Sequence, residues 1–289
     1  MRFLRGESTE DDELVLEGIT DLKLGCCQQM LANLPGTLQS LAFAEGFNQS
    51  LEHVKFPKNL QHLAFGKMFS KSLDQTGFPE NLQSLVLSAD FNRSLDLVSL
   101  PNNLQSLTFG YFFNQSLRRV RLPNRLRTLT FGDQYNQSLA RVKMPNSLQS
   151  ITFGMAFDQR MQHVVLPDTL HTLIFGARFD QPLEHMHLPS SLKSLAFGLC
   201  FDQSLEGVNL PQSLETLTFG SLFNKSLEGV TLPNSLQSLT FGEEYNQSLR
   251  RVKWPNSLQS LRSCLLGTSL TPAWKESTCR VVCKALRLV

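Results

Sequence analysis

The chain of 289 residues lacks the segments that direct proteins into or across membranes. Its N-terminus, MRFLRGESTEDDELV, is charged and has no apolar run of the kind found in a secretory signal. No apolar stretch is long enough to span a bilayer. The six cysteines are few for this length and lie mostly outside the regular part of the chain, which favours reduced thiols over a disulfide framework. We therefore expect a cytoplasmic or nuclear protein that is not secreted and has no membrane partner.

Strong charge and clustered chemistry are also missing. The formal net charge is +2, so no bulk electrostatic attraction to nucleic acid or membrane is implied. The histidines are scattered, and only His185 and His187 come close to one another, as alternate residues of one segment. Zinc would need further ligands, and no glycine-rich loop that could cradle a phosphate occurs. We predict no catalytic residues, no metal site and no cofactor, and hence no enzyme.

What the sequence does contain is an internal repeat. A proline recurs every 22 residues without an insertion. The prolines are Pro35, Pro57, Pro79, Pro101, Pro123, Pro145, Pro167, Pro189, Pro211, Pro233 and Pro255. We number each repeat from its proline as position 1, and PNSLQSLTFGEEYNQSLRRVKW (233–254) is a representative unit. So regular a period indicates one stacked architecture.

Each repeat carries two apolar half-motifs. Leu-x-x-Leu-x-Phe fills positions 4–9, and typically Leu-x-x-Val-x-Leu fills positions 17–22. Because apolar residues alternate at the end of each motif, we expect each half to form one short extended segment with a buried face. Glycine, common at position 10, would turn the chain through a positive φ or allow a close backbone approach, and proline would end the second segment. The fold class predicted is a mostly-β solenoid of about eleven turns.

The repeat also resembles a known family. The run LPxSLxxLxFGxxFNQxL is similar to the FNIP repeat, a relative of the leucine-rich repeat, over residues 34–262. Two features depart from the family pattern: Ser usually replaces Pro after Phe-Asn-Gln, with Pro182 as the exception, and Val usually replaces Gly at position 20. The resemblance implies a leucine-rich-repeat-like solenoid. Such arrays often follow an F-box or kinase domain, which implies partner recruitment, and neither domain is seen in residues 1–33.

The ends of the array differ from its middle and read as caps. Residues 1–33 form an N-terminal segment in which Ile19-x-x-Leu22-x-Leu24-Gly25 is a degenerate first repeat. The regular solenoid covers 34–262, and 263–289 form a C-terminal cap. Residues 272–288 have the pattern of an amphipathic helix, with Thr271 as the candidate N-cap. This helix would cover the end of the core or, alternatively, bind a partner.

Position 14 holds Asn or Asp in nearly every repeat and is predicted to form a structural ladder. In a stack these side chains superpose and can bond the backbone of the next turn. Asn-x-Ser is also the acceptor pattern for N-linked sugar, but that reading needs a secretory signal. Calcium at the acidic members would need further acids in the loop. The ladder residues are Asn48, Asn92, Asn114, Asn136, Asp158, Asp180, Asp202, Asn224 and Asn246, with Ser70 as the exception.

Two surfaces are candidates for partner binding. The first is a basic patch, which fits an acidic protein or phosphate partner, less well nucleic acid, or simply a solvated face. It comprises Arg118, Arg119, Arg121, Arg125, Arg127, Arg141 and Lys143. The second is the outward face of the predicted strand, which is rich in Ser and Thr. Alternatively, these residues occur there because threonine suits a half-exposed strand, or they form a regular array for ice or crystal binding. The candidate contacts on this face are Thr108, Thr130, Thr152, Thr218 and Thr240.

Together these features predict a non-enzymatic scaffold for protein–protein interaction with an unidentified protein partner. One alternative, implied only by the family resemblance, is the substrate-recognition part of a ubiquitin-ligase adaptor whose F-box is absent from this sequence. The other is a polyanion- or nucleic-acid-binding module, which is disfavoured because the phenylalanines are assigned to the core rather than to base stacking. Neither the oligomeric state nor the partner follows from the residues.

Overall fold

A computed structural model of the chain describes residues 2–4, 18–25 and 28–263. The chain divides into two compact units, one made of residues 1–137 with 142–148 and the other of 138–141 with 149–289. In both units the repeats stack as a parallel β-solenoid, about eleven turns in all, which confirms the predicted fold class. Among the described residues no helix is long and apolar enough to cross a membrane. The predicted C-terminal helix, 272–288, lies outside the described residues.

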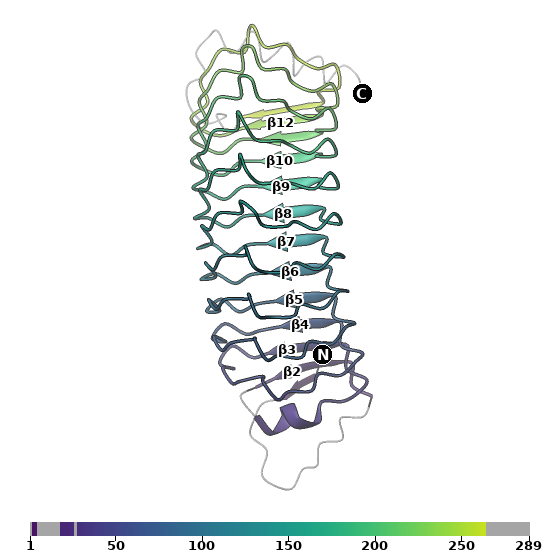
Figure 1. Ribbon diagram of the computed structural model, residues 1–289. Coiled ribbons are helices and arrows are strands. Elements are labelled where there is room, and N and C mark those ends of the chain that lie inside the picture. Colours follow the sequence, from purple (N-terminus) through teal and green to yellow (C-terminus); the bar gives the residue numbers. More distant parts are fainter. Residues whose placement is uncertain (1, 5–17, 26–27, 264–289) are drawn as a thin grey trace. The chain divides into compact units, whose positions relative to one another are not determined.

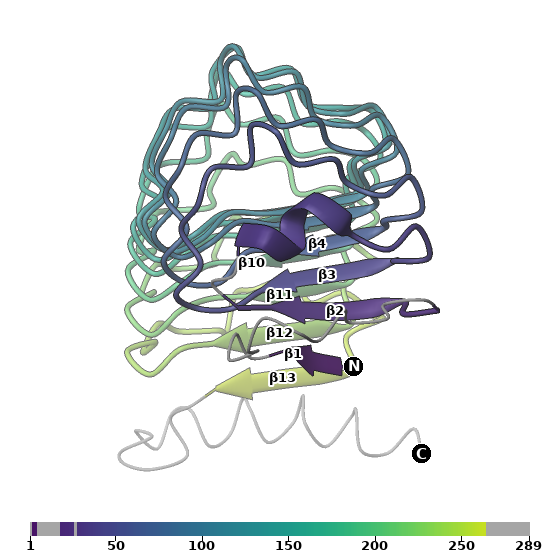
Figure 2. The same cartoon turned by 90° about the horizontal axis from the view of Figure 1, so that it is seen from below.

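The strands of the first unit pair in chain order, each parallel to the one before it (Figure 1). They are β1 (Arg2–Leu4), β2 (Asp21–Leu24), β3 (Ser40–Phe43), β4 (His62–Ala64), β5 (Ser84–Val86), β6 (Ser106–Thr108) and β7 (Thr128–Thr130). One 3₁₀ helix, η1 (Gln28–Asn33), follows β2 and precedes β3 along the chain, and in the view of Figure 2 it lies over β3 and β4. Strand β2 occupies the degenerate repeat, with Leu22 and Leu24 opposite Leu41 and Phe43. Neither β1 nor η1 was expected from the sequence.

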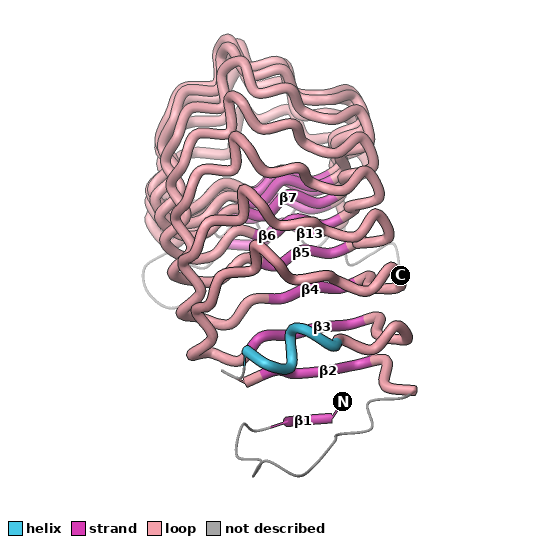
Figure 3. The backbone as a smooth tube through the Cα atoms, turned by 60° about the horizontal axis from the view of Figure 1, so that its bottom comes forward, coloured by secondary structure: helices cyan, strands magenta, loops and turns pink. Residues whose placement is uncertain are grey.

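The second unit repeats the same arrangement. Its strands are β8 (Ser150–Thr152), β9 (Thr172–Ile174), β10 (Ser194–Ala196), β11 (Thr216–Thr218), β12 (Ser238–Phe241) and β13 (Ser260–Ser263). All neighbouring pairs are parallel and keep equal repeat positions opposite each other, as in Leu217↔Leu239. In each unit the strands stand along one side of the coil, and apart from η1 in the first unit the rest of the described chain consists of turns and loops (Figure 3).

The second half of the repeat is not a strand. In the described repeats only positions near 6–8 pair in a sheet, so the prediction of a second extended segment at 17–22 is wrong. The N–H of Val120 donates to the carbonyl oxygen of Leu117 (3.0 Å), and the N–H of Arg118 donates to Oγ of Ser116 (3.3 Å). A serine at position 16 therefore begins a turn, and the Leu-x-x-Val spacing marks that turn rather than strand alternation.

Two columns of aromatic rings fill the core beside the leucines. Within a repeat, the rings at positions 9 and 13 stack closely, with 3.8 Å between the centroids of Phe219 and Phe223. Between repeats, Phe219 lies 5.7 Å from Phe241 and Phe201 lies 6.0 Å from Phe223. The leucines at positions 4, 7 and 17 are buried beside them in the inner repeats. Burial of these rings and of the leucines beside them stabilises the fold.

Glycine at position 10 provides clearance between neighbouring turns in most repeats. A Cβ built on Gly220 would lie 1.8 Å from the carbonyl oxygen of Gly198, and one on Gly132 would lie 1.7 Å from that of Gly110. None of these glycines has a positive φ, so of the two predicted roles the structure supports the close backbone approach. In the repeats that hold glycine, a side chain would meet the backbone of the preceding turn, whereas Ala44 and Ser88 occupy this position in two early repeats.

We expect Gly220→Ala to destabilise the protein strongly, by about 3 kcal/mol or more, because the clash is with backbone that cannot rotate away. Gly77→Ala is the matched control, since a Cβ there has open space and φ is not positive. Thermal unfolding followed by circular dichroism would measure both. Equal midpoints for the two variants would contradict the clearance role.

Candidate interaction surfaces and the side-chain ladder

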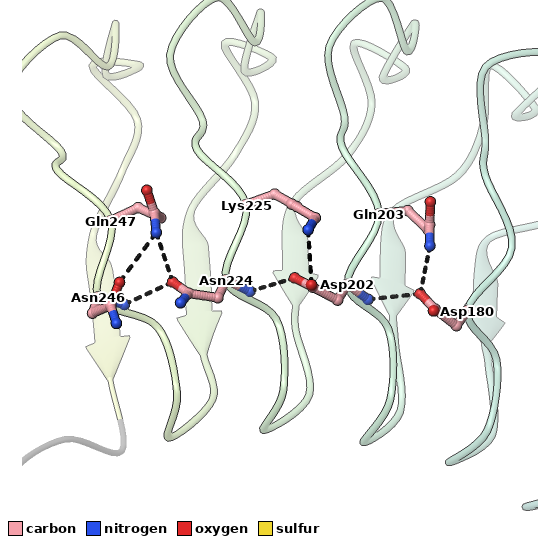
Figure 4. Close-up of polar contacts among 7 residues, drawn as sticks. All are labelled: Asp180, Asp202, Gln203, Asn224, Lys225, Asn246 and Gln247. Atoms are coloured by element: carbon pink, nitrogen blue, oxygen red, sulfur yellow. Dashed lines mark hydrogen bonds and ion pairs between the residues drawn. The ribbon is translucent and has the colours of Figure 1, made fainter.

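The side chains at position 14 bond each repeat to the next. In the second unit, the backbone N–H of Asp202 donates to Oδ1 of Asp180 (2.9 Å) and that of Asn224 donates to Oδ1 of Asp202 (2.8 Å). Asn246 donates to Oδ1 of Asn224 in the same way (3.0 Å), as Figure 4 shows. Outside the sheet, the side-chain oxygen thus takes the place of a backbone carbonyl as the acceptor for the N–H of the next repeat.

Position 15 supplies a second donor to the same side chain. Nε2 of Gln203 donates to Oδ1 of Asp180 (2.9 Å), and Nε2 of Gln247 donates to Oδ1 of Asn224 (3.1 Å). Where lysine replaces glutamine, Nζ of Lys225 forms an ion pair with Oδ2 of Asp202 (2.9 Å) (Figure 4). These acidic side chains therefore face donors of the protein itself, and no group of three metal-ligating side chains occurs in the described part of the chain.

The first unit has the same ladder with one interruption. Asn114 N–H donates to Oδ1 of Asn92 (2.9 Å) and Asn136 N–H to Oδ1 of Asn114 (2.9 Å). Ser70 N–H donates to Oδ1 of Asn48 (3.0 Å), but serine is too short to pass the contact on. Instead Nε of Arg93 donates to the carbonyl oxygen of Ser70 (3.0 Å). An arginine thus links the two repeats at the position where the asparagine is missing.

Burial and hydrogen bonding oppose each other at Asp202. Desolvation raises the pKa of its carboxyl group, but the hydrogen bonds from Lys225 and from the Asn224 backbone outweigh it, so the pKa is lowered from 3.8. The ionised carboxylate is therefore the form that the folded chain prefers.

Sequence reasoning missed a second ladder at position 3. In the early repeats, Nδ2 of Asn81 donates to the carbonyl oxygen of Lys58 (2.8 Å). In later repeats serine takes this role, and Oγ of Ser213 donates to the carbonyl oxygen of Leu192 (2.7 Å). The restriction of position 3 mainly to Asn and Ser was the available signal.

The predicted basic patch is only partly one surface. Arg118 and Arg119 are exposed in the turn that begins at Leu117, and Arg121 is exposed just after it; we call these three residues the basic turn. Lys143, also in the first unit and exposed, stands at position 21, the same position as Arg121 one repeat earlier. The remaining residue of that repeat, Arg141, belongs to the second unit and has a left-handed backbone with φ 70°.

The other two residues of the predicted patch precede β7. Nη1 of Arg125 donates to Oδ1 of Asn103 (2.9 Å), so this arginine links the turns that begin at the prolines of two successive repeats. Arg127 is exposed at position 5, next to the strand. These residues come from a different part of the repeat than the basic turn.

A second basic triplet provides an internal comparison. Arg250, Arg251 and Lys253 occupy the same positions as the basic turn, and Nη1 of Arg251 pairs with Oε1 of Glu228 at 3.0 Å. The equivalent acid before Arg119 is Asp96, which is one methylene shorter. No ion pair involves the basic turn in the described part of the chain. The positive charge of the basic turn is therefore less neutralised by neighbouring acids than that of the second triplet.

The threonine face is less regular than the candidate residues suggest. Thr108 and Thr130 lie opposite each other on β6 and β7 of the first unit. In the second unit Thr152 is followed along the same column by Ile174 and Ala196 before Thr218 and Thr240 resume. All of these side chains are half-buried. The interruption removes the unbroken lattice that an ice-binding array would present.

One aromatic expectation is wrong. The phenylalanines at positions 9 and 13 are buried, but Phe112 at position 12 is 50% exposed, and Tyr111 beside it is 40% exposed. Their rings meet edge to face with 4.7 Å between centroids. Position 12 lies outside the two core columns, which explains why aromatic content alone did not locate it.

Comparison with known proteins identifies the repeat. The profile described as FNIP Repeat matches residues 47–90, 69–112, 113–156, 135–178, 157–200, 179–222, 201–228 and 223–262. The crystal structure of CroV588, described as a novel circular LRR protein, is similar with a TM-score of 0.66 and 31% identity. That similarity covers 84% of this chain but 43% of the other, so this chain spans less than half the length of that relative.

The crystal structure of the pneumococcal vaccine antigen PcpA is a more distant match, which covers 86% of this chain and 63% of the PcpA chain at 12% identity. Its TM-score of 0.25 is too low to inform the fold. No curated protein matches the sequence.

We expect Asn224→Leu to lower the free energy of unfolding by about 1–3 kcal/mol, because the N–H of Asn246 and Nε2 of Gln247 lose their acceptor. Asn234→Leu is the control, since that side chain is exposed and makes no ladder bond. Chemical denaturation compares the two. If Asn224→Leu were instead neutral and the native protein carried a glycan on Asn224, the sugar-acceptor reading would replace the ladder.

The Asp202 carboxyl makes a contribution to stability that depends on pH. Because its pKa is lower folded than unfolded, the contribution is present above the unfolded pKa, about 4, and is lost as pH falls through the folded pKa. Asp202→Asn keeps the ladder acceptor but cannot titrate. The difference in Tm between wild type and this variant should therefore shrink on going from neutral pH to about pH 2–3. A constant difference would show that the ion pair with Lys225 is not stabilising.

Proposed function

The chain belongs to the FNIP repeat family, and on that premise we propose that it is a non-enzymatic scaffold that binds an acidic segment of a partner protein. A leucine-rich-repeat-like solenoid supports an interaction role because its stacked turns present long, regularly spaced surfaces. The adaptor function in ubiquitin transfer stays a prediction, since it depends on an F-box for which the described residues offer no observation.

The observation that carries the proposal is the basic turn. Arg118 and Arg119 lie at its tip and Arg121 follows, all exposed. The serine at position 16 fixes the backbone of this turn, so the guanidinium groups are held on a defined support. Lys143 adds a positive charge in the same unit. Three arginines on one turn favour carboxylates, which they can bind through paired N–H groups.

A polyanion partner is the competing possibility at the same residues. Base stacking needs exposed aromatic rings near the cationic groups. Tyr111 and Phe112 are exposed, but they belong to the turn directly after β6, whereas the arginines belong to the turn that begins at Leu117. The separate placement favours an acidic protein segment over single-stranded nucleic acid.

The test compares two triplets at equal repeat positions. Arg118→Glu/Arg119→Glu/Arg121→Glu should weaken binding of a fluorescent twelve-residue Glu–Ser peptide by about tenfold or more, since several exposed ion pairs of about 0.2–1 kcal/mol are lost together. Arg250→Glu/Arg251→Glu/Lys253→Glu should change it little, because Arg251 is already paired with Glu228. Fluorescence anisotropy measures both.

Equal losses in the two variants would show nonspecific charge attraction and reject the basic turn as a site. A single-stranded DNA of equal charge should bind more weakly than the peptide. The opposite order would favour the polyanion-binding alternative.

A further inference from the structure

The large apolar side chains that remain exposed are not spread evenly over the repeat. Positions 11 and 12, the turn that directly follows each strand, carry six of the eight in the described part of the chain. They are Met68, Tyr111, Phe112, Met155, Leu199 and Leu222. The other two, Leu97 and Val165, lie at positions 19 and 21. The corner after the strand is therefore the apolar edge of the solenoid.

In the second unit three successive repeats carry apolar residues at this edge, with Ser221 among them. We call Ala177, Leu199, Cys200 and Leu222 the apolar rim. The N–H of Cys200 donates to the carbonyl oxygen of Ala177 (2.7 Å), and that of Leu222 to the carbonyl oxygen of Leu199 (3.0 Å). Leu199 is 48% exposed and Leu222 45%. These cross-repeat bonds fix the rim backbone, so the apolar side chains are held at the spacing of the repeats, about 4.8 Å.

The fold itself does not demand apolar residues at this corner. Asp133 and Gln134 occupy it in one repeat, and Glu243 and Glu244 occupy it in another. The backbone bond across repeats persists in those turns, as in the N–H of Glu244 donating to the carbonyl oxygen of Ser221 (2.9 Å). The apolar side chains of the rim are thus not explained by packing of the core, which positions 9 and 13 fill.

Charged residues of opposite sign flank the rim at position 12, while Met155 at position 11 continues the apolar edge beyond Arg178. Arg178 is exposed at position 12 on one side, and Glu243 and Glu244 are exposed on the other. The ion pairs of the described residues involve neither the arginine nor these two acids. Arg178 and Glu244 are three repeats apart, which corresponds to about 14 Å.

We propose that the apolar rim binds a short segment of a partner protein with apolar side chains at its centre, a basic residue at one end and an acidic residue at the other. The basic end would lie over Glu243 and Glu244, and the acidic end over Arg178. The spacing of about 14 Å fits four or five extended residues or about ten helical ones. The rim residues belong to the second unit, whereas the basic turn belongs to the first.

The experiment uses a fluorescent synthetic peptide of twelve residues with Asp at one end, leucines in the centre and Lys at the other end. The full chain should bind it saturably. Leu199→Ser/Leu222→Ser should weaken binding by about tenfold, because half-exposed leucines would lose their contact with the peptide. Val165→Ser is the matched control: Val165 is 80% exposed but lies off the rim, so binding should not change.

Charge exchange tests the orientation. Glu243→Lys/Glu244→Lys should weaken binding of the first peptide. The same variant should strengthen binding of a second peptide, in which Glu replaces the terminal Lys. Circular dichroism checks that each variant folds. Absence of saturable binding, an equal effect of Val165→Ser, or failure of the exchanged peptide to gain affinity would overturn the proposal.

Two other occupants would also overturn it. Ser263 pairs with Phe241, two residues before Glu243, and the sequence continues through residues 264–289. A thiol cross-link between Cys200 and Cys279 or Cys283 in the full chain would show that this segment occupies the rim. A doubled mass in light scattering that Leu199→Ser/Leu222→Ser abolishes would instead show that a second copy of the chain occupies the rim.

Variants of the basic turn should leave peptide binding unchanged, which separates this test from that of the proposed function.

Discussion

Every part of the structure depends on the register in which one repeat lies on the next. Equal positions stack directly on one another, leucine on leucine in the sheet and ring on ring in the core. A parallel ladder alone would hold only the few residues of each strand. The rest of each turn is held by backbone bonds at the corner after the strand and by side chains at positions 3 and 14 that reach the backbone of the adjacent turn. The spacing set by the sheet is therefore maintained around the whole coil.

This register explains why so much could be predicted from the sequence. The uninterrupted period of 22 residues fixes the stack, and the columns of Leu and Phe identify the core by residue type and spacing alone. The Leu-x-x-Val motif was harder to interpret, because two buried residues separated by two others fit a turn as well as a short strand. The hydrogen bond from Val120 N–H to Leu117 distinguishes them, and the serine at position 16 was its only sequence signal.

The candidate surfaces were predicted less well than the fold. Repeat numbering places residues in columns, but it does not show which charges are already neutralised. Arg251 and Arg119 are equivalent in sequence, yet only Arg251 meets an acid of sufficient length. The exposed apolar corner was missed for a related reason: Phe112 and Leu222 have core-like composition, and only burial distinguishes them from their buried neighbours. Exposure is a property of the stack that the composition of one repeat does not contain.

The ladder at position 14 has a direction, and this direction bears on how such chains grow. In these ladder bonds the side-chain oxygen accepts from the backbone of the following repeat, so each repeat with Asn or Asp at position 14 offers its successor the same acceptor. A gene duplication that inserts 22 residues in frame therefore creates a turn whose donors and acceptors are already matched on both sides. The close identity of YNQSLARVKMPNSLQS and YNQSLRRVKWPNSLQS is consistent with such events. Evolution can change the length of this protein in whole turns while its internal bonding stays the same.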